Sequence, residues 1–108
     1  MGVNELVELV NEDCKIRYAY RDEDGNTCVI GHLAVKAGLE HLLPAVGSEA
    51  NTERLGKFGE LRDALCEFYG VTRGLLYNMQ SANDNSEDIE DRRSSITKVL
   101  RCPHCYSD

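Results

Sequence analysis

The feature that most constrains the fold is a stripe of large apolar side chains between residues 53 and 70. The side chains recur every three or four positions, which is the spacing of one face of an α-helix. Gly70 follows them, at a position where the end of a helix favours a left-handed backbone. The sequence therefore predicts a helix over residues 53–70. Its apolar face would contain Leu55, Phe58, Leu61, Leu65 and Phe68.

Two more helices are predicted after this one. Thr72 can cap a helix over residues 73–82, and Ser86 can cap one over residues 87–101, because a hydroxyl oxygen accepts hydrogen bonds from the free N–H groups of a helix start. The last helix is acidic in its first turn and basic in its last turn, which the helix dipole favours. Its predicted inner face comprises Ile89, Ile96, Val99 and Leu100.

The first half of the chain carries two further helical segments. Residues 3–13 form a short amphipathic pattern that Asn4 can cap. Residues 31–47 have apolar side chains at helical spacing, with an interruption or cap at Gly38 and an end near Pro44.

Between these two segments the apolar period changes from helical to alternating. Polar and apolar side chains alternate over residues 15–22, and Asp24 and Gly25 provide the positive backbone angles of a tight turn. We therefore predict an antiparallel β-hairpin over residues 15–22 and 27–30, packed against the helices because an isolated hairpin is marginal in water.

These elements predict a mainly α fold of the α+β class, with four to five short helices and one N-terminal hairpin. The chain has 108 residues, 42% of them hydrophobic, which suits a single compact domain over residues 1–101, as a monomer or small homo-oligomer, followed by a tail at 102–108. Its apolar runs are too short to span a membrane, and its N-terminus lacks the pattern of an export signal. A cytoplasmic location is therefore expected.

The charge balance indicates which partners are favourable. Twelve Lys and Arg against nineteen Asp and Glu give a formal net charge of −7. This charge repels a phosphate backbone and argues against non-specific nucleic-acid binding, whereas it favours a protein with a basic surface. The alternative interpretation is that the charge serves solubility alone.

Residues 62–81 fit the apolar and glycine pattern of a helix-turn-helix motif. In a DNA-binding version, Arg73, Asn78 and Gln80 would face base edges, with Tyr77 as a further contact residue for nucleic acid or a partner. The second helix has a single basic residue, and an acidic stretch follows it. The alternative is therefore an ordinary corner between two helices.

The cysteines suggest two kinds of site. Cys28 precedes a helical segment and His32 follows it by four residues, which is the outline of a thiol nucleophile with a base; packing of Cys28 in an apolar run is the alternative. Cys102 and Cys105 form a Cys-Pro-His-Cys tail, followed by too few residues for the helix of a thiol oxidoreductase. Together with Cys28 and His32 they could instead bind a structural zinc ion; Cys14 or the tail of a second chain are the alternative partners for the ion. The remaining alternative is a loose thiol-bearing end, with no cofactor.

Three segments, residues 22–38, 61–85 and 92–100, resemble small uncharacterised proteins of phages and other mobile elements. In these proteins a Cys-x-x-Gly segment precedes a helix pair and an Asn-Asp motif, here Asn83 and Asp84. The resemblance implies a compact, mostly helical accessory domain and assigns no activity. The two side chains of the Asn-Asp motif are expected to close a turn or cap a helix.

Three functional hypotheses follow. The preferred one is a non-enzymatic accessory or inhibitor protein that acts by protein contact, with a host defence nuclease or another nucleic-acid-binding factor as the expected target, as for an anti-CRISPR protein. The second is a helix-turn-helix DNA-binding regulator. The third is a small thiol enzyme that uses Cys28 and His32.

Overall fold

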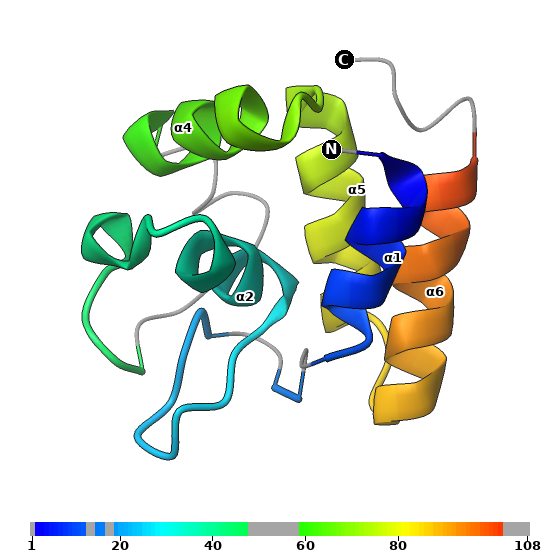
Figure 1. Cartoon of the computed structure of the whole chain (residues 1–108). Coiled ribbons are helices and arrows are strands. Elements are labelled where there is room, and N and C mark those ends of the chain that lie inside the picture. Colours follow the sequence, from blue (N-terminus) through cyan, green and yellow to red (C-terminus); the bar gives the residue numbers. More distant parts are fainter. Residues whose placement is uncertain (1, 13–14, 17–18, 48–58, 103–108) are drawn as a thin grey trace.

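The computed structural model describes residues 2–12, 15–16, 19–47 and 59–102, and all regular secondary structure in these ranges is helical (Figure 1). None of the helices in these ranges is long and apolar enough to cross a bilayer. The radius of gyration of 12.2 Å is that of a compact domain of this length. In chain order the elements are α1 (Val3–Val10), α2 (Val29–Lys36), the 3-10 helix η1 (Glu40–Leu42), α4 (Gly59–Tyr69), α5 (Arg73–Asp84) and α6 (Ile89–Arg101).

The helices form two groups around a shared core. Helices α5 and α6 are antiparallel neighbours, and α1 packs against α6 (Figure 1). Helix α2 packs against α5, α1 and η1, while α4 contacts α5 and α2. The fully buried large side chains come from both groups, so the core joins them into one unit. They are Tyr20, Ile30, Leu33, Leu61, Leu65, Tyr69, Leu75, Leu76, Met79, Ile96 and Leu100.

The predicted β-hairpin, and with it the α+β class, is wrong. The described residues contain no β-strand, and the pairing of the two arms is reduced to a single bridge between Arg21 and Thr27. The turn itself forms, because the Asp22 carboxylate accepts the backbone N–H of Asp24 and Asn26 at 3.0 and 2.9 Å. Residues 17–18 of the first arm lie outside the described ranges.

The second arm is helical because other groups satisfy its backbone donors. Cys28 is the N-cap of α2, and its sulfur accepts the backbone N–H of Gly31 at 3.5 Å. The N–H of Val29 is bound by the side chain of Asn83 on α5, at 3.0 Å. Val29 and Ile30 therefore start a helix, since these contacts supply partners for N–H groups that a helix start leaves free.

The expected caps are only partly correct. Thr72 caps α5 as predicted, with its hydroxyl accepting the N–H of Leu75 at 3.1 Å. The N-cap of α1 is Gly2 rather than Asn4. Helix α6 is capped by Asp88 and not by Ser86; the Asp88 carboxylate accepts two backbone N–H groups of the first turn. A carboxylate satisfies those donors and also favours the positive end of the helix dipole.

The stripe predicted over residues 53–70 is shifted at its C-terminal end. The described part of this segment begins at Gly59, so residues 53–58 lie outside it. Leu61 and Leu65 are buried as predicted, but Phe68 is 51% exposed and Tyr69 takes the inward position. The Tyr69 hydroxyl donates a 2.6 Å hydrogen bond to the carbonyl of Leu33, so the core gains a paired polar group together with the ring.

Candidate functional site

The thiol of Cys28 is enclosed at the junction of α2 and α5. It has no exposed surface, and its sulfur lies 3.9 Å from Oε1 of Gln80, to which it can donate. Burial raises the pKa of Cys28 to about 12. The thiol therefore stays protonated at neutral pH, whereas a nucleophile or zinc ligand has to be a thiolate.

His32 faces a different neighbour from Cys28. The imidazole is almost fully buried, with Nε2 3.4 Å from Oε2 of Glu12, which lies just after α1. The same carboxylate oxygen is 3.0 Å from Nζ of Lys36. The Lys36 ammonium holds the pKa of Glu12 below its ordinary value. His32 thus belongs to a charged contact between α1 and α2, while the Cys28 thiol faces α5.

The proposed zinc ligands are not assembled in the described residues. Cys28 and His32 lie at the start and middle of α2, whereas Cys102 follows the far end of α6 (Figure 1). The described part of the chain contains no group of three or more His, Cys, Asp or Glu side chains that could hold a metal ion. Cys105, the fourth predicted ligand, lies outside the described residues.

Beside Cys28 lies a buried polar network that the sequence patterns do not reveal. Nε2 of Gln80 and Nδ2 of Asn83 donate to the two carboxylate oxygens of Asp84, at 2.9 and 3.2 Å. Asn83 also donates to the carbonyl of Ile16 at 3.2 Å and accepts the N–H of Val29. The Asn-Asp motif therefore ties α5 to the start of α2, instead of closing the turn between α5 and α6.

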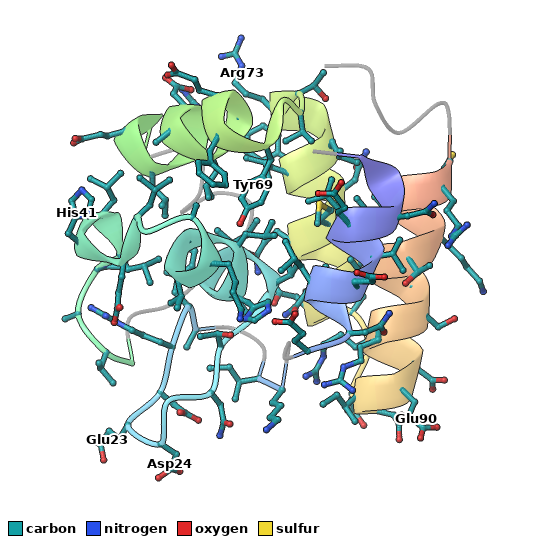
Figure 2. All side chains as sticks on the ribbon, viewed as in Figure 1. Glu23, Asp24, His41, Tyr69, Arg73 and Glu90 are labelled. Atoms are coloured by element: carbon teal, nitrogen blue, oxygen red, sulfur yellow. The ribbon has the colours of Figure 1, made fainter. Side chains whose placement is uncertain are left out.

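The predicted contact residues of the α4–α5 corner are divided between surface and core. Arg73 and Asn78 are exposed, and Figure 2 shows Arg73 at the upper edge of the molecule. Tyr77 is half-buried, with its hydroxyl 3.4 Å from the guanidinium of Arg62. Gln80 is fully buried, so it presents no surface to bases or a partner in this structure. The corner offers one exposed cation and one exposed amide from the predicted set.

Exposed carboxylates lie at two places along the opposite end of the molecule, at the lower left and the lower right of Figure 2. Glu23 and Asp24 lie on the turn after Asp22, and Glu90 and Asp91 lie in the first turn of α6. Figure 2 shows Glu23, Asp24 and Glu90 along the lower edge, away from Arg73. We call these four residues, Glu23, Asp24, Glu90 and Asp91, the acidic end. Each of the two pairs of carboxylates attracts a basic surface at distances up to about a Debye length, roughly 8–10 Å at ordinary salt.

We expect Cys28 to resist alkylation in the native protein. Because its thiol is buried and its pKa is raised, it should react with iodoacetamide on the order of a hundredfold more slowly than a free thiol. Cys66 and Cys102 are partly exposed and serve as internal references. Peptide mapping by mass spectrometry, with and without urea, measures the three rates. Equal rates for Cys28 and Cys66 in the native protein would contradict the enclosed position of Cys28.

Comparison of the chain with protein-family models, with curated proteins and with solved structures gives no match. The resemblance to proteins of phages and mobile elements therefore stays a prediction. Any function has to be argued from the geometry above.

Proposed function

We propose that this protein is a small non-enzymatic binding protein that acts on a protein partner through its acidic end. The observation that carries the proposal is the position of Glu23 and Asp24 on a turn and of Glu90 and Asp91 on a helix start, at one end of the molecule. The partner would present Lys and Arg side chains, as nucleic-acid-binding proteins do. The role that fits this contact is that of an accessory or inhibitor protein of a phage or mobile element.

The surroundings of the reactive groups support binding rather than catalysis. The Cys28 thiol is enclosed and protonated, and the neighbouring amides and carboxylate of the network are bonded to one another. His32 contacts Glu12 on the other side of α2. A thiol enzyme needs a nucleophile and a base within reach of one another and of a substrate. The buried polar groups are used instead to fix α2 against α5.

The charges on the rest of the surface favour a basic protein, and not DNA, as the partner. Arg62, near the α4–α5 corner, is tied to Asp63 at 2.9 Å, and this carboxylate raises the pKa of the guanidinium. Of the predicted base-reading side chains, Arg73 and Asn78 are exposed and Gln80 is buried. Phosphate contacts require several cations around a groove. A net charge of −7 opposes them.

A charge-reversal experiment tests the proposal. We expect the double variant Glu23→Lys with Glu90→Lys to lose at least about tenfold in affinity for the partner, because like charges then face each other across the interface. The partner is first captured from host lysate at low and moderate salt and identified by mass spectrometry. The purified partner is then titrated calorimetrically against the wild type and the variant.

The matched control is Glu5→Lys with Glu8→Lys on α1, which changes the net charge by the same amount. It should bind the partner within about threefold of the wild type, since net charge alone then changes only the long-range attraction. Equal losses in both variants would show that the acidic end is not the contact. Recovery of no specific partner at either salt concentration would overturn the proposal.

A further inference from the structure

A shallow groove opens on the side of the molecule where α4 lies beside the end of α2 and η1. It has a volume of about 410 Å³ and is lined by Leu39, Ala64, Glu67 and Phe68. Figure 1 shows α4 and η1 on the same side of the fold, away from α6. This volume is within the range of sites that bind small ligands or single anchoring side chains, roughly 300–1,000 Å³.

The ring of Phe68 forms one wall of this groove and rests against a buried ring. It is 51% exposed, although it belongs to a helix whose other large apolar side chains are buried. Its ring packs edge-on against the buried ring of Tyr69, with the two centroids 4.8 Å apart. Tyr69 is itself anchored by its hydrogen bond to Leu33. An aromatic side chain that is both exposed and supported in this way can bind a partner with little loss of conformational entropy.

The rim of the groove is acidic. Glu60 and Glu67 are seven residues apart on α4, so they lie on the same side of that helix as Ala64 between them. Both carboxylates are exposed and form no ion pair with a described residue. The cations of the neighbouring elements are bound elsewhere, Arg21 to Glu40 at 3.2 Å and Lys36 to Glu12. Two carboxylates on α4 therefore flank the apolar lining along that helix.

We propose that this groove is the docking site for a basic segment of the partner protein, in which one large apolar side chain is flanked by Lys or Arg. The apolar side chain would pack between Phe68, Leu39 and Ala64, and the flanking cations would lie beside Glu60 and Glu67. This inference rests on the proposed function, because it assigns the basic partner a second and apolar point of contact. It makes Phe68 the central residue of the interface.

A titration with a defined probe tests the groove directly. The probe is a short synthetic peptide with one phenylalanine between lysines, and its reference has serine in place of that phenylalanine. Binding is followed in amide NMR spectra of the whole protein. We expect saturable shifts of the Ala64, Glu67 and Phe68 resonances, and affinity about tenfold lower for the serine peptide, because an apolar side chain is worth that much when buried.

Protein variants complete the test. Phe68→Ser and Ala64→Arg should each lower the affinity for the peptide about tenfold. Val46→Ser is the control, because this side chain is 48% exposed and lies outside the groove lining, and it should leave the affinity unchanged. Phe68→Ser and Ala64→Arg should also bind the partner protein more weakly, in parallel with the peptide.

Two results would overturn the docking site. One is unchanged peptide affinity in Phe68→Ser and Ala64→Arg. The other is a protein dimer in sedimentation that Phe68→Ser dissociates, because a second copy would then occupy the groove. Either result leaves the proposed function standing if Glu23→Lys with Glu90→Lys still lowers the affinity for the partner. Loss of that charge dependence, with peptide binding retained, would overturn the proposed function alone.

Discussion

Replacing Gly31 with alanine is expected to destabilise the protein by about 3 kcal/mol or more, the upper range for inserting a carbon into a packed interior. An added Cβ at this position would overlap the backbone carbonyl oxygen of Tyr20 and lie 2.9 Å from its carbonyl carbon. The carbonyl has little freedom to move, because it accepts the N–H of Cys28 at 3.2 Å and the Tyr20 side chain is buried. The close approach of this chain segment to α2 therefore requires glycine.

Gly59→Ala is the matched control for this prediction. At Gly59, in the first position of α4, the nearest atom to an added Cβ is the end of the flexible Arg62 side chain at 3.3 Å. Alanine should be neutral there or stabilise by up to about 1 kcal/mol, since it favours a helix more than glycine does. Urea unfolding followed by circular dichroism measures both free energies. A Gly31→Ala protein as stable as Gly59→Ala would mean that α2 does not approach Tyr20 this closely.

The helical part of the fold could be predicted because it depends on local spacing. Apolar side chains at a period near 3.6 residues indicate the helices over residues 73–82 and 87–101, whose observed counterparts are α5 and α6. Thr72 has its predicted role because an N-cap bonds to a group only three residues away. Spacing alone does not decide which residue ends the 53–70 stripe, because Phe68 and Tyr69 are adjacent apolar residues. The choice between them depends on the carbonyl of Leu33, a distant partner.

The hairpin error has the same physical origin. An alternating pattern and an Asp-Gly turn favour paired strands. The segment after the turn instead starts α2, where the side chain of Asn83, 54 residues away, accepts the N–H of Val29. Asn83 bonds to Val29, and the Cys28 sulfur bonds to Gly31. The contact with Asn83 exists only once α5 is packed against α2, whereas the Cys28 cap is local to the start of α2. No local pattern in the sequence contains the Asn83 contact, so the polar network could not be predicted, whereas packing of Cys28 in its apolar run is one of the two interpretations that the sequence offers.

The Cys-x-x-Gly and Asn-Asp segments have complementary roles in this structure. Gly31 permits the close approach of Tyr20, Cys28 caps α2 with its sulfur, and Asn83 binds the first N–H of that helix. The segments that suggested a thiol site in the sequence thus determine the position of α2. This in turn holds Leu33 beneath Tyr69, which supports Phe68 at the groove. The sequence elements behind the predicted thiol site therefore contribute to the proposed interface.

Asn83→Ala tests the contribution of the Asn83 side chain, which joins α5 to the start of α2. The change removes the acceptor of the Val29 N–H and the donor to the Ile16 carbonyl, and it leaves both backbone groups without this partner. It also removes one of the donors to the Asp84 carboxylate. A buried polar group left unpaired costs about 1–3 kcal/mol, so we expect the free energy of unfolding to fall by about 3 kcal/mol in total.

Asn85→Ala provides the comparison, because it deletes the same side chain two residues away. Asn85 is exposed, and its amide donates to the hydroxyl of Ser81 at 3.2 Å on the surface of α5. Loss of such an exposed bond should change the stability by no more than about 0.5 kcal/mol. Urea unfolding should therefore separate the free energies of the two variants by about 2 kcal/mol or more. If both variants unfold at the wild-type midpoint, α2 does not depend on α5 for its start, and the support it gives to Tyr69 and the groove has to come from the apolar core alone.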